Sequence, residues 1–176
     1  MRCFIAIDIP EEIREKIYEI NKFLKGVKHK PVAKENLHLT LKFLGEIDDH
    51  KVNFVIDKMK SLKIKKFRAS LGSIGFFPNQ DFVRVLWIGL EPCSLIKTIH
   101  EEIDKVLKPY FKEDKRFESH ITISRIKNVK DKKIWEKIKK IKIEANFDVE
   151  EIKLKRSILK KEGPEYHDIY IFKLLD

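Results

Sequence analysis

The sequence carries one short pattern twice, as His38-Leu39-Thr40-Leu41 and as His120-Ile121-Thr122-Ile123. Each copy alternates a histidine, an aliphatic residue, a threonine and a second aliphatic residue. Because side chains two positions apart point to the same side of a β-strand, the alternation predicts a strand with one polar and one apolar face. Each strand should therefore present one imidazole and one hydroxyl to the same space, while its aliphatic residues anchor it in a core.

The residues around the two motifs also repeat. Three pairs of landmarks are separated by 80 to 82 positions: Phe4 and Val85, His38 and His120, Phe67 and Phe147. A nearly constant interval between landmarks of different kinds indicates a duplicated strand–helix–strand–helix–strand unit. We expect approximate repeat units at 1–79 and 80–160, with a C-terminal strand at 166–176 that completes the sheets.

Hydrophobic spacing assigns the elements of each half. It predicts strands at 3–7, 37–43, 67–74, 82–90 and 120–123, and helices at 13–24, 51–62, 95–106 and 134–141. No proline-rich or glycine-rich linker separates the halves, so we expect residues 1–176 to form a single bilobal domain. The predicted fold class is α+β, with two mostly antiparallel sheets that face a central cleft and with helices on the outer faces.

The charge of the chain favours a polyanionic partner. The 176 residues carry a formal net charge of +10, and the sequence pI is about 9.4. Lysine and arginine neutralise phosphates, so such a charge is typical of nucleic-acid binding. Abundant lysine and glutamate with a single glutamine, Gln80, is also typical of thermophile proteins that use surface ion pairs. Charge alone leaves both interpretations open.

The cysteines and the apolar segments bear on location. Cys3 and Cys93 have neither the density of a disulfide framework nor the spacing of a metal knuckle, so we expect packing residues in a reducing compartment. No stretch approaches the roughly 18 uninterrupted apolar residues of a membrane span. The first residues enter an alternating pattern that differs from a signal peptide. We expect a soluble, cytoplasmic monomer with no membrane partner.

Two imidazoles that face one another suit displacement at phosphorus. One proton must leave the attacking oxygen while another reaches the departing oxygen, and histidine is poised near neutrality for both tasks. The hydroxyls of Thr40 and Thr122 could donate hydrogen bonds to the non-bridging oxygens, where charge builds in the transition state. This chemistry needs neither a metal nor another cofactor, and it forms no covalent intermediate.

Two other interpretations of the histidines stand beside this one. A histidine flanked by aliphatic residues is often a hydrogen-bonded structural residue, but two such residues at matching points of a duplication favour a catalytic pair. A zinc site would need a third ligand, and no Cys, His, Asp or Glu stands at comparable spacing beside either strand. His29, His50, His100 and His167 lie on expected loops or helices and receive no role.

Taken together, the chain resembles the two-histidine phosphoesterases, and among them the RNA 2′,3′-cyclic phosphodiesterases, also called 2′-5′ RNA ligases. The resemblance covers nearly the whole chain. It is carried by the stretches Arg2-Cys3-Phe4-Ile5-Ala6-Ile7, Asn36 to Gly45, Arg84 to Leu90, His120-Ile121-Thr122-Ile123-Ser124-Arg125, Ser157-Ile158-Leu159 and Gly163-Pro164-Glu165-Tyr166. The family usually has proline immediately before the second histidine, where this chain has Ser119.

The resemblance implies roles for the two histidines. His38 would protonate the leaving 3′ oxygen, and His120 would accept a proton from the attacking water, which leaves a 2′-phosphate on an RNA end. The residues alone do not assign these directions, because the two motifs are nearly symmetric. With a 5′-hydroxyl in place of water, the reverse reaction would make a 2′-5′ linkage.

Three further residues are candidates for substrate binding. Arg125 could bind phosphate through its guanidinium, but strict alternation places it on the apolar face unless the strand ends or bulges there. Phe43 is its counterpart in the first half, and alternation favours the core over a platform for a base. Tyr166 could line the rim of the site or pack a turn. The lysines of 130–142 should form the solvated face of an amphipathic helix, with steering of RNA as a secondary use.

Two other functions remain open at this point. The chain could act on a small cyclic nucleotide or a cyclic-phosphate sugar, although its positive charge favours RNA ends. It could also be an RNA-binding module without turnover, although intact His and Thr in both motifs argue against that.

Overall fold

The computed structural model describes all residues, 1–176, and has the predicted α+β class. The strands are β1 (Arg2–Asp8), β2 (Val27–Pro31), β3 (His38–Glu46), β4 (Phe67–Asn79), β5 (Phe82–Glu91), β6 (His120–Val129), β7 (Asn146–Val149), β8 (Glu151–Lys160) and β9 (Gly163–Lys173). The helices are α1 (Glu11–Tyr18), α2 (Asp49–Lys60), α3 (Cys93–Leu107) and α4 (Ile134–Ile138), with 3₁₀ turns η1 (Glu19–Phe23) and η2 (Lys34–Asn36).

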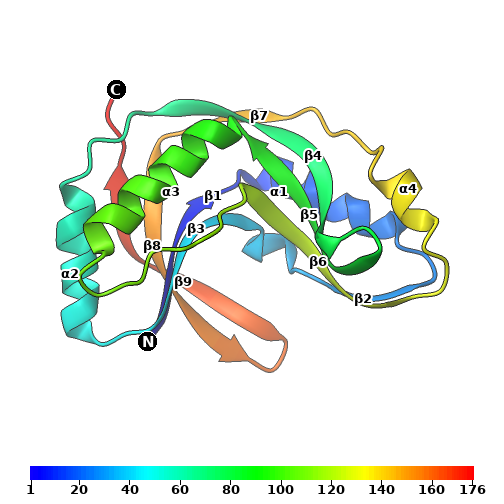
Figure 1. Cartoon of the computed structure of the whole chain (residues 1–176), viewed down its shortest axis with the longest axis horizontal. Helices are drawn as coiled ribbons and strands as arrows, with labels where there is room; N and C mark the ends of the chain where they lie inside the picture. The colour runs from blue at the N-terminus through cyan, green and yellow to red at the C-terminus, as the bar shows by residue number, and fades with distance from the viewer.

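All nine strands belong to one curled sheet (Figure 1). Each pair of neighbouring strands in this sheet is antiparallel. Its order is β7-β4-β5-β6-β3-β1-β8-β9, and β2 pairs with β6 beside this path. The order is symmetric about the junction of β6 and β3, with four strands on either side. The antiparallel, duplicated arrangement predicted from the sequence is therefore confirmed.

One residue pair joins the two halves of the sheet. Leu39 of β3 lies opposite Ile121 of β6, and it is the only ladder pair between these strands. The two sheets expected from the sequence are thus two halves of a continuous sheet, and the two histidine motifs lie directly beside one another at its centre.

The two repeats exchange their last strands. β4 closes the first repeat, yet it pairs with β5 of the second; β8 comes from the second repeat and pairs with β1 of the first. The strands β4 and β7 also pair with each other, with Ala69 opposite Phe147. Strands from both halves of the sequence therefore support the sheet on either side of the two histidine strands, β3 and β6.

A single apolar core lies under the sheet. It comprises 39 buried residues, among them Leu39, Leu41, Ile121 and Ile123 from the two motifs. Helix α3 packs against β3 and β5, and η1 packs against β6 on this side. The aliphatic residues of both motifs are at most 1% exposed, so they anchor the strands as predicted. None of the helices has the length and apolar character needed to span a bilayer.

Candidate active site

The pairing of Leu39 with Ile121 sets the geometry of the site. Extending this register by one residue in each direction places His38 opposite Thr122 and Thr40 opposite His120. All four polar side chains therefore lie on one face of the sheet, around a local two-fold axis. Diagonal neighbours of this kind lie about 7 to 8 Å apart, and their Cβ atoms are somewhat closer than that. The imidazoles are near enough for the charge of His120 to contribute to lowering the pKa of His38.

Both imidazoles are held in the same way by the backbone two residues earlier. The Nδ1–H of His38 donates to the carbonyl of Asn36 at 2.7 Å, and that of His120 donates to the carbonyl of Glu118 at 2.8 Å. A carbonyl can only accept, so in each neutral ring the proton is on Nδ1 and the lone pair is on Nε2. The two Nε2 atoms are thus the atoms available for proton transfer.

The Nε2 atoms have different partners. Nε2 of His38 lies 2.8 Å from Oγ1 of Thr40, whose hydroxyl donates to it. Nε2 of His120 has no protein partner. The hydroxyl of Ser119, the residue before His120, donates to the carbonyl of Leu90 at 2.6 Å. This bond fixes the start of β6 against β5 immediately before His120.

Aromatic rings surround both histidines. His38 lies 5.0 Å from the ring centre of Phe4 and 5.3 Å from that of Tyr166. His120 lies 4.9 Å from Phe77 and 5.8 Å from Trp87. Most of these contacts are edge-to-face, which fixes the orientation of each imidazole. Phe77 could not be predicted from the sequence, because it reaches the site from β4, a strand that pairs with β5.

Burial lowers the pKa of both histidines. Desolvation is the largest cause for His38, and the hydrogen bond to the Asn36 carbonyl opposes it. The same two causes act on His120, where Glu118 supplies the carbonyl and a nearby charge. Desolvation disfavours the imidazolium ion, so both rings are mainly neutral at pH 7 before substrate binds. A bound phosphate anion would favour the protonated form of the nearer ring.

A ring of four charges lies beside His38. Lys153 and Lys155 each pair with both Asp8 and Asp168, at 2.7 to 3.1 Å. Asp8 is the ladder partner of His38. Within this network desolvation opposes ionisation, but the hydrogen bonds to the two lysines outweigh it and lower the pKa of both aspartates. The four charges balance, so the network holds β1, β8 and β9 together without adding a free charge to the site.

A bulge in β3 changes the side on which two residues lie. Ile5 is opposite Lys42 while Ala6 is opposite Thr40, so Leu41 is the extra residue. Beyond the bulge, Lys42 is 3% exposed and Phe43 is 73% exposed. The core position that strict alternation favoured for Phe43 is therefore wrong. The bulge turns Phe43 to the face of His38, where it packs 6.4 Å from Phe4.

The second motif has the same bulge at the equivalent place. Leu86 is opposite Ser124 while Trp87 is opposite Thr122, so Ile123 is the extra residue. Arg125 is consequently exposed on the face of His120 and Thr122. Strict alternation made such a bulge the condition for Arg125 to reach the site. Its charge also reaches Tyr166 of the other half: burial raises the pKa of that phenol, and Arg125 opposes the shift. Arg125 and Tyr166 therefore both face the two histidines.

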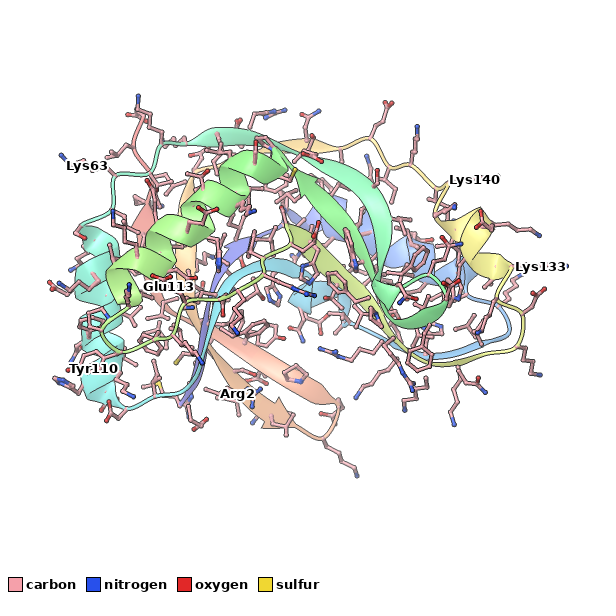
Figure 2. All side chains as sticks on the ribbon, in the orientation of Figure 1. Arg2, Lys63, Tyr110, Glu113, Lys133 and Lys140 are labelled. Atoms are coloured by element: carbon pink, nitrogen blue, oxygen red, sulfur yellow. The ribbon has the colours of Figure 1, made fainter.

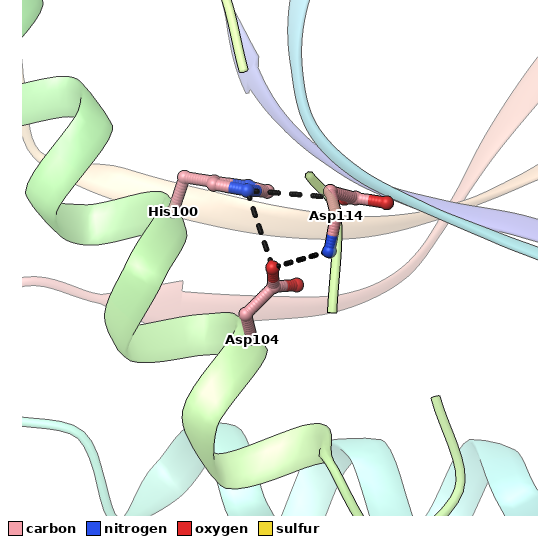
Figure 3. Close-up of side chains that lie close together, drawn as sticks. All are labelled: His100, Asp104 and Asp114. Carbon is pink, nitrogen blue, oxygen red and sulfur yellow. Dashed lines mark hydrogen bonds and ion pairs between the residues drawn. The ribbon is translucent and has the colours of Figure 1, made fainter. Parts of the chain in front are cut away.

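Three potential metal ligands do come together, but on the other side of the sheet. His100 and Asp104 of α3 meet Asp114 of the following loop (Figure 3). Nζ of Lys42 lies 2.5 Å from Oδ1 of Asp104 and 3.2 Å from Oδ2 of Asp114. The lysine ammonium thus already supplies the cation of this cluster. Nδ1 of His100 donates to the carbonyl of Leu41 at 2.7 Å, so the cluster supports the β3 bulge.

The remaining basic side chains of the sequence prediction lie away from the histidines. Trp135 and Ile138 are the buried residues of α4, and the lysines around them are exposed. Lys133 and Lys140 extend into solvent at that end of the molecule (Figure 2). This is the solvated helix face that the sequence predicted. Two hollows elsewhere on the surface, one between α2 and β9 and one beside Asp148, contain none of the predicted site residues.

Comparison with known proteins places the chain in a family. The profile of the LigT-like phosphoesterases matches residues 7–87 and again residues 88–166. The chain belongs to this family. The double match agrees with the duplicated unit seen in the sequence and in the sheet.

Curated relatives and solved structures extend the likeness over the full length. An RNA 2′,3′-cyclic phosphodiesterase of Archaeoglobus fulgidus is 36% identical over 98% of this chain and 99% of its own, and one of Methanocaldococcus jannaschii is 38% identical over 96% and 98%. The crystal structure of Escherichia coli LigT in apo form matches with a TM-score of 0.81 at 25% identity, covering 99% of this chain and 98% of that chain. LigT complexed with 3′-AMP matches with a TM-score of 0.80, also at 25% identity and over the same shares of the two chains.

Proposed function

We propose that this LigT-like phosphoesterase hydrolyses 2′,3′-cyclic phosphates at RNA ends to 2′-phosphomonoesters, with His38 and His120 as general acid and base and without a metal. The observation that carries the proposal is the pair of Nε2 atoms on one face of the sheet, each prepared by an Nδ1–H bond to a backbone carbonyl. The names of the full-length relatives support the substrate. One chain supplies every residue of the site, so a monomer is sufficient.

The proposed reaction is one in-line displacement. A water molecule attacks phosphorus and gives a proton to Nε2 of His120 as the new P–O bond forms. The bond from phosphorus to the 3′ oxygen breaks, and that oxygen takes a proton from Nε2 of His38. The products are a 2′-phosphate and a 3′-hydroxyl, and the two rings then exchange protons with solvent to restore the starting state.

The surroundings of the two rings support this division of roles. His38 is the more enclosed ring, between Phe4 and Tyr166, and the anionic substrate would bring it the negative charge that favours its protonated form. His120 is the more open ring, and its Nε2 is free of protein partners. That position suits a base that must accept a proton from water.

The threonines and Arg125 would stabilise the charge on the non-bridging oxygens. Thr40 donates to His38 in the free protein, and its hydroxyl would turn to the phosphate once that ring is protonated. Thr122 lies at the symmetric position on the other strand. Arg125 can add a charged hydrogen bond because it is exposed on the same face.

The exposed aromatic residues would receive the terminal nucleoside. Phe43 presents an open ring on the face of His38, and Tyr166 stands edge-on to that histidine. A base can stack on such a ring without regard to its sequence. The reverse reaction, in which a 5′-hydroxyl replaces water and a 2′-5′ linkage forms, would use the same groups in the opposite direction.

A second candidate substrate is a small cyclic nucleotide. It is favoured by one observation: the related LigT of E. coli has been crystallised with 3′-AMP, so a site of this family can hold a single nucleotide. The two candidates differ in what lies on the 5′ side of the cyclic phosphate. They are separated by comparing turnover of 2′,3′-cyclic AMP with turnover of an oligoribonucleotide that ends in the same nucleotide.

The decisive experiment identifies the product in the absence of free metal. The purified protein is incubated with EDTA and an oligoribonucleotide that ends in a 2′,3′-cyclic phosphate, and the monoester is identified by phosphorus NMR. We expect a 2′-phosphate at an undiminished rate. A 3′-phosphate would reverse the assignment of the leaving oxygen, and loss of turnover with EDTA would remove the metal-independent mechanism.

A further inference from the structure

A strip of exposed cations extends from the active site along β6 and its neighbours. It consists of Lys28 and Lys30 on β2, Arg125 and Lys127 on β6, and Arg84 on β5, and we name these five residues the cationic ladder. Each of the five side chains is exposed. Arg125 is the member nearest the histidines, and the others lie farther along the same strands.

The pairing register places the ladder on the face of the histidines. Lys30 is the ladder partner of Arg125, and directly opposed residues point to the same side of a sheet. Lys28 lies two positions from Lys30 and is exposed like it, while His29 between them turns inward to Ser124 at 2.7 Å. Lys28 and Lys30 therefore share the side on which Arg125 lies.

Two more bulges complete the strip. In β6, Lys28 pairs with Asn128 and His29 with Ile126, so Lys127 is an extra residue that remains exposed. In β5, Val83 pairs with Pro78 and Val85 with Phe77, so Arg84 is an extra residue that has no partner on β4. Its guanidinium donates to the carbonyl of Lys127 at 3.4 Å, which ties the two bulges together.

None of the ladder residues is neutralised. All five are absent from the ion pairs of the molecule, and the strand segments that carry them, 27–31, 82–85 and 125–129, contain no acidic residue. The basic residues beside His38 behave differently, since Lys153 and Lys155 are each paired with two aspartates. Five unpaired cations in one strip on the active-site face favour an anionic partner with charges spaced along a line.

We propose that the cationic ladder binds the sugar–phosphate backbone of single-stranded RNA on the 5′ side of the terminal cyclic phosphate. The inference rests on the proposed function, because the reacting phosphate at His38 and His120 sets where the strand begins. From there the chain passes Arg125 and continues along β2 and β6. Neighbouring strands lie about 4.8 Å apart and alternate residues about 6.7 Å apart, so the cations form a two-row track.

The far end of the ladder carries a platform for a base. Phe82 is 55% exposed, and the guanidinium of Arg84 lies 4.4 Å from the centre of its ring. An aromatic ring beside unpaired cations is the combination that single-stranded nucleic acid uses, because bases stack while phosphates are neutralised. An RNA chain that leaves the site along the ladder would reach Phe82 after Lys127.

The test separates the RNA chain from the reacting nucleotide. The variant carries Lys28→Gln, Lys30→Gln and Lys127→Gln, none of which is among the groups proposed to contact the reacting phosphate. Its control carries Lys16→Gln, Lys97→Gln and Lys105→Gln, which remove the same charge from exposed, unpaired positions on α1 and α3. kcat/KM is measured for 2′,3′-cyclic AMP and for a single-stranded oligoribonucleotide with the same end.

We expect the ladder variant to lose about tenfold or more in kcat/KM for the oligonucleotide and to stay within about twofold of wild type for cyclic AMP. The control should stay near wild type for both substrates. Equal losses on both substrates would place the lysines in the reaction itself and overturn the proposal. An equal loss in the control would mean that the effect comes from the lower net charge and not from these positions, which would also overturn the proposal.

Binding without turnover keeps the inference separate from the proposed function. Fluorescence anisotropy follows an oligonucleotide that ends in a 2′-phosphate, over a range of salt concentrations. Each phosphate neutralised on a single strand contributes about 0.7 to the slope of log affinity against log salt, so the variant should lose about 2 from that slope. An unchanged slope would contradict the ladder, even if the wild-type protein hydrolyses cyclic phosphates; a reduced slope would support it, even if hydrolysis fails.

Discussion

The two halves of the active site reach the same geometry by different means. Both histidine strands bulge three residues after the histidine, and each bulge leaves a carbonyl to be satisfied under the sheet. In the first half the side chain of His100 donates to the carbonyl of Leu41. In the second half the backbone N–H of Val32 donates to the carbonyl of Ile123 at 2.9 Å. A duplicated site thus retains its surface geometry while its buried supports diverge.

The difference has a physical consequence. A backbone donor does not depend on the identity of its residue, whereas the donor at Leu41 belongs to a replaceable side chain within a buried set of charges. His100, Asp104 and Lys42 are each at most 5% exposed. Loss of one member removes a hydrogen bond or an ion pair from the buried set, which is costly. The first half should therefore be the more sensitive to mutation beneath its strand.

The largest expected effect tests whether the histidine of each half is equally necessary for the reaction. His38→Ala and His120→Ala should each lower kcat/KM by about a thousandfold or more, because each ring moves a proton in the same step. The rates are measured on an oligoribonucleotide cyclic phosphate, with circular dichroism as a check of folding. His50→Ala, on the exposed surface of α2, is the control and should keep the full rate. If either histidine variant retained a near-normal rate, that ring would have no part in the mechanism.

The next effect compares the side-chain support of the first half with a side-chain hydrogen bond beside the second bulge, from His29 to Ser124. His100→Ala should lower the free energy of unfolding by about 2 to 4 kcal/mol, since it leaves the buried Leu41 carbonyl without its donor and removes the contact of His100 with Asp104. His29→Ala removes only the bond to Ser124 and should cost about 1 kcal/mol. Urea denaturation measures both. We also expect kcat/KM, corrected for the folded fraction, to fall in His100→Ala alone, and equal behaviour of the two variants would refute the asymmetry.

A smaller effect compares the residues that follow the two bulges. Arg125→Gln should lower kcat/KM by about 10 to 100-fold, because a charged hydrogen bond is worth about 1.5 to 3 kcal/mol. Phe43→Ala should raise KM by about fivefold, equivalent to about 1 kcal/mol of base stacking. Steady-state kinetics on cyclic AMP separates the two. A larger effect for Phe43 would mean that the base contributes more than the phosphate contact.

The smallest effect concerns pH. The reactive free protein carries a proton on His38 and none on His120, and kcat/KM reports these free-enzyme groups. Burial lowers both pKa values from the ordinary 6.5, so His38 loses its proton and His120 becomes neutral below that pH. The maximum of kcat/KM should therefore lie below pH 6.5 and decline as the pH rises further. An optimum at pH 7 or above would contradict the effect of burial.

The sequence predicted those parts of the site that follow from local alternation. The aliphatic residues of both motifs are buried, and the polar residues share one face, because the pattern over four residues settles both facts. Duplication was visible from the constant interval between landmarks. The α+β class and the antiparallel pairing then followed from the order of elements.

The parts that escaped prediction depend on neighbouring strands. Lys42 is buried and Phe43 exposed because β1 imposes a bulge, and nothing within β3 alone signals it. Asn36 and Glu118 act through backbone carbonyls, so their side chains gave no indication of the role. His100 was assigned no function because its partners, Asp104 aside, come from distant segments.

The exchange of β4 and β8 between the repeats bears on the origin of the molecule. A half-length chain could not complete its own sheet, since its last strand pairs with the other copy. Two such chains would instead assemble as a symmetric dimer, with the Leu39–Ile121 contact on the symmetry axis and one histidine from each subunit. Gene fusion would release the halves from symmetry, which is the condition for an acid and a base to specialise.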